Sequence, residues 1–272
     1  MTKNLDKDGL RSIIQNYDIF YIDLWGVVHN GITLHKNAIE ALEEITKAKK
    51  KFVLLTNAPR PKKTVRMILE KMGMNKEVSK KVYSSGEASL SYLKKNYSEK
   101  KFYHIGPTRD FDLFVEFKDN KVKEMNESSY LLCTGLFENQ HKDLDYYKEL
   151  FKDHINKKMI CTNPDLIVER GDKRELCAGS IALIFEEMGG DVIYFGKPFP
   201  EVYNNSINNV DKKILSIGDN LNTDIKGANL LNYDSLIISN GVHKNEIKKE
   251  GIGIVSKKYE VTVNFIQTEL KW

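Results

Sequence analysis

Cysteine is scarce in this sequence of 272 residues, since it occurs only at Cys133, Cys161 and Cys177, and no two of these form a CxxC pair. Neither a disulfide framework nor a zinc site is therefore expected. No apolar run approaches the ~20 residues of a membrane helix, and the first residues lack the apolar stretch of a secretory signal. We expect a protein of the reducing cytoplasm that makes no membrane contact.

An excess of one charge is also missing. The 42 Lys and Arg residues are interleaved with 38 Asp and Glu residues, which leaves a net charge of +4. Nucleic-acid binding needs a basic stripe, usually with stacking aromatics, and none stands out. Hydrophobic residues make up 41% of the chain and aromatic residues 10%, which is enough for a folded core. The composition predicts a globular protein with no nucleic-acid partner.

Short apolar runs alternate with amphipathic helical patterns along the chain. Strands are expected at residues 19–22, 52–55, 192–195, 214–217 and 236–238, with helices at 36–50 and around 65–72. Such alternation is typical of a parallel sheet covered by helices. A middle segment repeats the pattern, with strands at 102–105, 130–133 and 159–161 and helices around 144–151 and 181–188. We predict an α/β core with an α/β insertion.

Polar residues follow the expected core strands. Asp23 ends the first of these strands, Thr56-Asn57 ends the second, Lys197 follows the third, and Asp219 follows the fourth, with Asp224 one helical turn later. Ligands of parallel sheets bind at this edge. Two carboxylates there can share Mg²⁺, a lysine can offset phosphoryl charge, and a carboxylate can form an aspartyl-phosphate. One such residue could merely cap a helix, but the set in this order favours a shared site.

Four motifs resemble the haloacid dehalogenase (HAD) superfamily, class IIA, over nearly the whole chain. They are Tyr21-Ile22-Asp23-Leu24-Trp25-Gly26-Val27, Leu55-Thr56-Asn57, Gly196-Lys197-Pro198, and Gly218-Asp219-Asn220-Leu221-Asn222-Thr223-Asp224. The resemblance implies a Rossmann-like core, a parallel sheet flanked by helices, with an inserted α/β cap of the C2 type. We place the core at residues 1–99 and 193–272, and the cap at 100–192. A class IIA subgroup shares the Asp-x-Trp-Gly-Val pattern.

The resemblance also implies roles for individual residues. Asp23 matches the phosphoryl-accepting nucleophile and first Mg²⁺ ligand. The remaining metal positions fall on the Trp25 backbone carbonyl and Asp219, with Asp224 supporting them, and the phosphate positions fall on Leu24, Trp25, Thr56, Asn57 and Lys197. Substrates of the family are small phosphorylated metabolites. Substrate contacts are expected from Arg60, which could equally pair with an acidic surface residue, and, in the cap, from Asn163, Asp165 and Ser180. A homodimer is compatible with the resemblance.

Trp25 departs from the family pattern, because most phosphatases of the superfamily have a second aspartate at this position. That aspartate protonates the leaving oxygen, and such acid–base catalysis contributes about 10²–10⁴-fold to the rate. Three interpretations stay open. The substrate has a good leaving group, or His29 substitutes as the acid, since histidine has a suitable pKa. In the third, the chain is a catalytically weak or inactive HAD-fold protein that binds phosphometabolites and has a binding or regulatory role.

Overall fold

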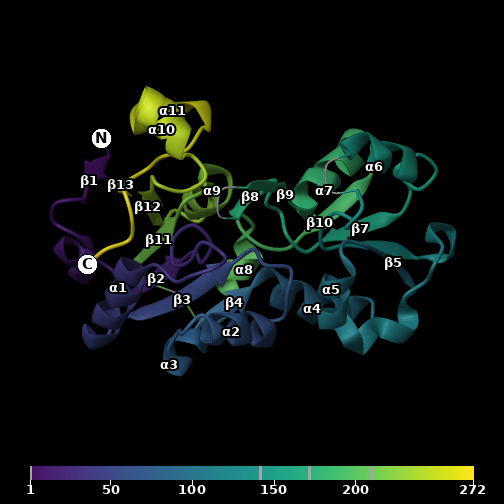
Figure 1. Ribbon diagram of the computed structural model, residues 1–272, viewed down its shortest axis with the longest axis horizontal. Helices are drawn as coiled ribbons and strands as arrows, with labels where there is room; N and C mark the ends of the chain where they lie inside the picture. Colours follow the sequence, from purple (N-terminus) through teal and green to yellow (C-terminus); the bar gives the residue numbers. More distant parts are fainter. Residues whose placement is uncertain (1, 141–142, 171–172, 209–210) are drawn as a thin grey trace.

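The computed structural model describes residues 2–140, 143–170, 173–208 and 211–272, and two parallel sheets form the framework of two lobes (Figure 1). The first lobe contains both termini and a seven-stranded sheet in the order β1-β13-β12-β11-β2-β3-β4. Its strands are β1 (Lys3–Asn4), β2 (Ile19–Ile22), β3 (Lys51–Thr56), β4 (Val82–Ser84), β11 (Ile214–Gly218), β12 (Asp234–Ile238) and β13 (Phe265–Gln267). Every pairing in it is parallel.

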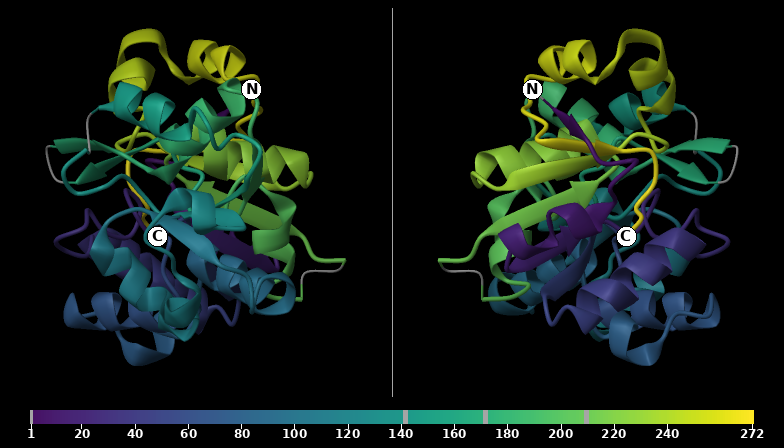
Figure 2. Two further views of the ribbon diagram at one scale, coloured as in Figure 1. Left: turned by 90° about the vertical axis from the view of Figure 1, so that its right-hand side faces the viewer. Right: turned by 90° about the vertical axis from the view of Figure 1, so that its left-hand side faces the viewer.

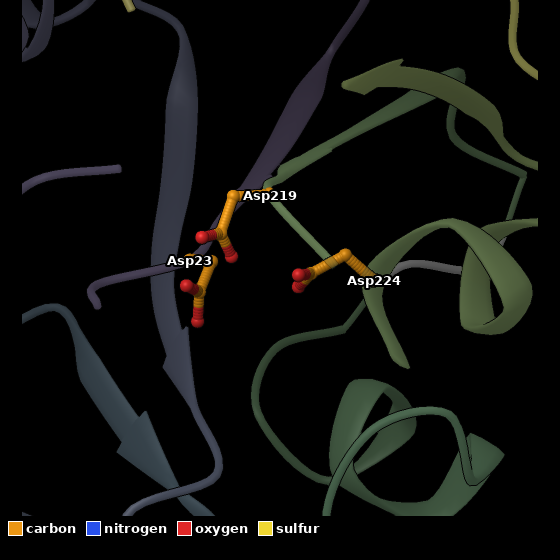
Figure 3. Close-up of side chains that lie close together, drawn as sticks. All are labelled: Asp23, Asp219 and Asp224. Atoms are coloured by element: carbon orange, nitrogen blue, oxygen red, sulfur yellow. The ribbon is translucent and has the colours of Figure 1, made fainter. Parts of the chain in front are cut away.

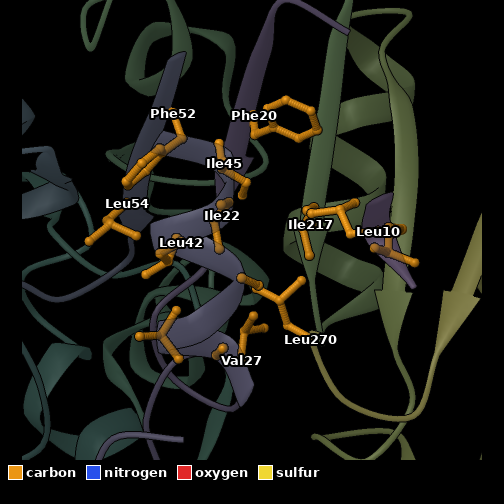
Figure 4. Close-up of a cluster of buried hydrophobic side chains, with 14 of the residues drawn as sticks. Leu10, Phe20, Ile22, Val27, Leu42, Ile45, Phe52, Leu54, Ile217 and Leu270 are labelled. Atoms are coloured by element: carbon orange, nitrogen blue, oxygen red, sulfur yellow. The ribbon is translucent and has the colours of Figure 1, made fainter. Parts of the chain in front are cut away.

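Helices cover both faces of this sheet. On one face, α1 (Lys36–Lys47) and α2 (Lys62–Lys71) pack against β2, β3 and β11, where Leu42 and Ile45 of α1 join Ile22, Phe52 and Ile217 in one apolar cluster (Figure 4). On the other face, α8 (Pro200–Asn204), η5 (Leu221–Ile225) and α11 (Ile252–Lys258) contribute to two further clusters. Strands buried on both faces read as continuous apolar runs, as the sequence of β2 does.

The second lobe is built on a four-stranded parallel sheet in the order β10-β7-β6-β5. Its strands are β5 (Phe102–Ile105), β6 (Tyr130–Cys133), β7 (Lys158–Cys161) and β10 (Asp191–Tyr194). Helices α6 (Leu144–Phe151) and α7 (Ala178–Glu187) pack on one face, and α4 (Ser85–Asn96) packs on the other. An antiparallel hairpin of β8 (Ile167–Arg170) and β9 (Lys173–Leu176) completes the strands.

Short helices connect these elements, and the two turned views show how they surround the sheets (Figure 2). They are η1 (Leu10–Ser12), η2 (Ile14–Asn16), α3 (Lys76–Ser79), α5 (Thr108–Phe111), η3 (Asp112–Asn120), η4 (Met125–Glu127), α9 (Lys226–Leu230) and α10 (Lys244–Glu250). Among the helices of the described residues, none has the length and apolar character needed to cross a membrane.

The predicted fold class, a parallel sheet flanked by helices with an α/β insertion, is confirmed, but one strand was assigned to the wrong sheet. The run at residues 192–195 was expected in the core, yet β10 pairs with β7, with Val192 opposite Met159. A short apolar run does not specify its sheet, because either sheet buries it equally well. Similarly, α4 lies in the expected core segment, while its Leu93 is buried in an apolar cluster of the second sheet.

The chain passes between the lobes at two adjacent points, Ser85 and Gly196. Ser85 Oγ donates a hydrogen bond of 2.6 Å to the carbonyl of Thr162 in the second lobe. Gly196 has φ +122°, and a Cβ there would lie 3.0 Å from the Ser85 Cβ and 2.5 Å from Asn57 Oδ1. Only glycine avoids that close approach. The two crossings therefore lie side by side, and the second of them, Gly196, directly precedes Lys197 in the chain.

Candidate active site

Asp23 and Asp219 lie side by side because the strands that precede them are neighbours. Ile22 of β2 is opposite Ile217 of β11 in parallel register, and the Asp23 amide donates to the Ile217 carbonyl at 2.8 Å. Both side chains are buried, with exposed fractions of 7% and 4%. Figure 3 shows their carboxylates next to each other, with Asp224 pointing toward them from η5, the helix after β11. The strand order thus brings together the carboxylates that the sequence singled out.

Lys197 is the cation of this group. Its Nζ donates to Asp23 Oδ1, to Asp224 Oδ1 at 2.7 Å, and to the Leu55 carbonyl at 3.0 Å. Carboxylate oxygens of Asp23, Asp219 and Asp224 all lie within 4.8 Å of one another. With all four side chains ionised, three negative charges face one positive charge. The buried cluster therefore carries a formal charge of −2.

Burial and, after it, the neighbouring charges shift the pKa values of this cluster. Burial raises the pKa of Asp23 to about 7, although the Lys197 ammonium acts in the opposite direction. Burial, and then the charges of Asp23 and Asp224, hold the pKa of Asp219 well above its usual range. Burial alone would lower the pKa of Lys197, but the surrounding carboxylates outweigh it and raise that pKa. The lysine therefore stays protonated, and its single positive charge does not offset the negative charges of the three ionised carboxylates.

Asp219 is held in a confined position that leaves its oxygens beside Asp23. The Val242 amide donates to Asp219 Oδ2 at 3.0 Å. A Cβ on Gly26 or on Gly241 would lie 2.1 Å from the same oxygen, and Gly26 has φ +83°. Three buried carboxylates with an uncompensated charge of −2 are a donor set suited to a hard divalent cation. Asp23, Asp219 and Asp224 are therefore placed to hold a divalent cation.

Asn57 connects three chain segments at the end of β3. Its Oδ1 accepts from the Lys197 amide at 2.7 Å, and its Nδ2 donates to the Lys197 carbonyl at 3.0 Å. The same Nδ2 donates to Asp165 Oδ1 of the second lobe at 2.9 Å. Beside it, the buried Thr56 accepts through Oγ1 from the Ala58 amide at 3.2 Å. This network fixes the backbone on which Lys197 stands.

A cleft of about 990 Å³ lies between the two lobes. Most of the sequence-predicted substrate residues line it, namely Leu24, Trp25, His29, Thr56, Asn57, Arg60, Asn163 and Asp165. Val65, Ile68, Leu69 and Met72 of α2 add an apolar wall on the side of the first lobe. Ser180, like Asp23 and Lys197, is not among the described residues that line the cleft. Its Oγ donates to the Leu166 carbonyl at 2.6 Å and so fixes the loop that carries Asp165.

Trp25 and His29 pack against each other where the loop after β2 folds back. Their ring centroids are 5.1 Å apart in an edge-to-face arrangement. His29 is buried, and its Nδ1 accepts from the Gly31 amide at 2.9 Å. A Cβ on Gly31, whose φ is +86°, would lie 2.5 Å from the Trp25 ring. The indole occupies the loop position at which the resemblance leads us to expect a second carboxylate.

Arg60 forms an ion pair with a partner that sequence reasoning did not identify. Its Nη2 lies 3.0 Å from Oδ1 of Asp110, a buried residue of α5 that also lines the cleft. Arg174 and Glu175 of β9 line the cleft as well. No motif marks these three residues, because they reach the cleft only through the packing of the second lobe on the first. A sequence pattern carries no signal for such a contact.

Two family models match the chain. Residues 20–118 match a family described as haloacid dehalogenase-like hydrolase, and residues 194–260 match one described as HAD-hydrolase-like. No significant match was found among curated proteins. A haloacid dehalogenase-like hydrolase from Brucella suis is a similar solved structure, with 32% identity over 86% of this chain and 90% of that chain, and a TM-score of 0.79.

Two more distant structures share the fold. A p-nitrophenyl phosphatase from Archaeoglobus fulgidus has 16% identity over 93% of this chain and 97% of its own, with a TM-score of 0.71. A glycerol phosphate phosphatase from Mycobacterium tuberculosis, solved in complex with magnesium, has 22% identity over 85% of this chain and 70% of its own, with a TM-score of 0.62. From the family models and the Brucella relative, we conclude that the chain belongs to the haloacid dehalogenase-like hydrolase family.

Proposed function

We propose that this chain is a class IIA member of the family, a Mg²⁺-dependent phosphatase-type hydrolase that acts on a small phosphorylated metabolite. The observation that carries the proposal is the buried cluster of Asp23, Asp219, Asp224 and Lys197 beside a cleft between two lobes. Three carboxylates with one lysine are arranged to hold a cation and a dianionic phosphoryl group together. The phosphatases that share the fold support the reaction class.

The two lobes suggest a division of labour. We propose that the seven-stranded sheet is a core of residues 1–84 and 196–272, and that residues 85–195 form a cap. This moves the expected boundaries so that α4 and β10, which pack with the second sheet, belong to the cap. Closure of such a lobe over strand ends excludes water and selects the substrate. The cap side of the cleft, which includes Asn163 and Asp165, supports that role.

In the proposed reaction, Asp23 is the nucleophile. One of its carboxylate oxygens attacks phosphorus, and the aspartyl-phosphate that forms is then hydrolysed. Lys197 offsets the phosphoryl charge, while the Thr56 hydroxyl and the backbone amide of Asn57 hold the phosphoryl oxygens. Mg²⁺, held by Asp23, Asp219 and the Trp25 carbonyl with Asp224 supporting them, would neutralise part of the phosphate charge. The indole of Trp25 cannot transfer the proton that the leaving oxygen needs.

His29 is the substitute acid that the sequence suggests. It lies against Trp25 and lines the cleft, which supports access to a substrate. Its Nδ1 accepts a hydrogen bond from the Gly31 amide, so the other ring nitrogen carries the proton of the neutral ring. Replacement of His29 by Ala tests the role. If turnover and its pH profile are unchanged, His29 is not the acid.

The proposed function is tested with two substrates that have good leaving groups, p-nitrophenyl phosphate and acetyl phosphate. Both are assayed with Mg²⁺ and with EDTA, for the unchanged protein and for Asp23→Asn. We expect Mg²⁺-dependent phosphate release that Asp23→Asn abolishes. If neither substrate is hydrolysed while Mg²⁺ and inorganic phosphate still bind, turnover is refuted. The chain is then a phosphometabolite-binding or regulatory protein.

A further inference from the structure

Asp165 brings a carboxyl group from the second lobe to the phosphate side of the cleft. It lies on the loop between β7 and β8, and its Oδ1 accepts from Asn57 Nδ2 at 2.9 Å. Asn57 in turn bonds through its Oδ1 to the Lys197 amide at 2.7 Å. Asp165 is half-buried and lines the cleft. A carboxyl from the cap side is thus linked through one residue to the lysine of the buried cluster.

The loop that carries Asp165 is fixed at several points. The Asp165 amide donates to Asn163 Oδ1 at 3.0 Å, and the Asp165 carbonyl accepts from the Gly179 amide at 3.1 Å. A Cβ on Gly179 would lie 2.3 Å from the Pro164 carbonyl, so the loop packs directly on the first turn of α7. A group that transfers a proton must be held in place by its surroundings. The loop provides such support.

The other cleft carboxylates are placed less favourably. Asp110 forms an ion pair with Arg60 at 3.0 Å, so its carboxylate is committed to a guanidinium. Glu138 is exposed, and Glu175 lies on the β8–β9 hairpin. Among the described carboxylates of the cleft wall, Asp165 is the one that accepts a hydrogen bond from Asn57. A substrate phosphoryl group held at Asn57 would therefore have Asp165 as its neighbouring carboxyl.

We propose that Asp165 supplies the general acid and base that Trp25 cannot supply, an inference that rests on the proposed function. As the Asp23 oxygen bonds to phosphorus, the bond from phosphorus to the leaving oxygen breaks, and the protonated Asp165 gives its proton to that oxygen. Alcohol leaves, and Asp165 becomes a carboxylate. It then takes a proton from water as the water oxygen bonds to phosphorus and the bond from phosphorus to the Asp23 oxygen breaks. Phosphate leaves, and the Asp23 carboxylate and protonated Asp165 are restored.

The surroundings of Asp165 suit this exchange. Burial raises its pKa to about 6, while Lys197 and the Asn57 hydrogen bond act in the opposite direction and Asp224 adds to the rise. Asp23 and the thiols of Cys161 and Cys177 are the other titratable groups that interact with it. Burial keeps both thiols neutral, because it raises their pKa values. An acid that titrates near the working pH can both give and accept a proton.

The test compares substrates whose leaving groups differ in their need for a proton. The p-nitrophenolate of p-nitrophenyl phosphate leaves unaided, whereas the alkoxide of glycerol phosphate does not. For Asp165→Asn, we expect kcat on glycerol phosphate to fall by about 10²-fold or more, and kcat on p-nitrophenyl phosphate to fall only a few-fold. The high-pH limb of the glycerol phosphate profile should also disappear. Glu138→Gln removes another carboxylate of the cleft wall and should leave kcat on both substrates unchanged.

Each other outcome decides against the inference. An equal loss on both substrates makes Asp165 a positioning residue, and a selective loss on glycerol phosphate in His29→Ala instead assigns the acid to His29. If the unchanged protein turns over p-nitrophenyl phosphate but neither glycerol phosphate nor any other alkyl phosphate of a metabolite panel, no acid operates, while the proposed function stands. If Asp23→Asn leaves turnover unchanged, the proposed function itself fails. Asp165→Glu, which keeps a carboxyl, should retain more glycerol phosphate turnover than Asp165→Asn, and equal activities would contradict the inference.

Discussion

Replacing the proposed nucleophile should stabilise the metal-free protein at alkaline pH. The pKa of Asp23 is raised from 3.8 to about 7 in the folded chain, so the folded state binds this proton more tightly than the unfolded state. Stability is therefore lost as the pH rises from about 4 to about 7. The substitution Asp23→Asn keeps nearly the same side-chain shape but introduces an amide that does not ionise. The variant escapes that loss.

The size of the effect follows from the pKa shift. One unit corresponds to about 1.4 kcal/mol, so a rise of about three units is worth at most about 4 kcal/mol. Because part of this shift lies below pH 4.5, the stability of Asp23→Asn relative to the unchanged protein should increase by up to about 3 kcal/mol between pH 4.5 and pH 8. Asp219→Asn should act in the same direction, because burial and the neighbouring carboxylates raise the pKa of Asp219 as well.

The assay is urea unfolding in EDTA at a series of pH values. Asp153→Asn, which changes an exposed aspartate of the second lobe, serves as the control and should show no pH-dependent gain. Saturating Mg²⁺ should reverse the order, because a ligand that binds only the folded state stabilises the protein that binds it better. A stability difference between Asp23→Asn and the unchanged protein that stays flat across this pH range would refute the raised pKa of Asp23 in the folded chain.

Three further substitutions test other parts of the structure. Gly26→Ala places a methyl group 2.1 Å from Asp219 Oδ2, so Mg²⁺-dependent turnover of p-nitrophenyl phosphate should fall by about 10²-fold, and turnover within twofold of the original would contradict this packing. Phe185→Ala leaves a cavity in the apolar core of the second lobe. In urea unfolding, the free energy of unfolding should fall by about 3–5 kcal/mol. A loss below about 1 kcal/mol would contradict the packing of Phe185 in that core. Asn57→Ala leaves the Lys197 amide without its side-chain acceptor. The free energy of unfolding should fall by about 1–3 kcal/mol, and turnover should be lost. Unchanged activity would show that Lys197 is held by other contacts.

Sequence reasoning succeeded where local pattern and strand topology act together. The apolar runs of β2 and β11 specify buried parallel strands, and parallel strands place the residues after them at one edge of the sheet. For this reason Asp23 and Asp219 could be brought together without coordinates, and the structure puts their carboxylates side by side. The family membership expected from the four motifs is also confirmed.

The remaining features depend on contacts between segments that no local pattern encodes. The run at residues 192–195 suits either sheet, and only its register with β7 decides between them. Arg60 was expected to reach a second substrate anion or an acidic residue, and its choice of Asp110 follows from where α5 packs. Likewise, Ser180 has the polarity of a binding residue, but its hydroxyl is used within the Asp165 loop.

The adjacency of Ser85 and Gly196 has a consequence for how this architecture can change. A segment that leaves and re-enters a domain at one point can be shortened, lengthened or exchanged without altering the strand order of its host. Joining the chain across these two positions would bypass the whole second lobe and leave the seven-stranded sheet continuous. New specificities can therefore arise by replacement of one insert, while the residues that surround Lys197 in the host stay where they are.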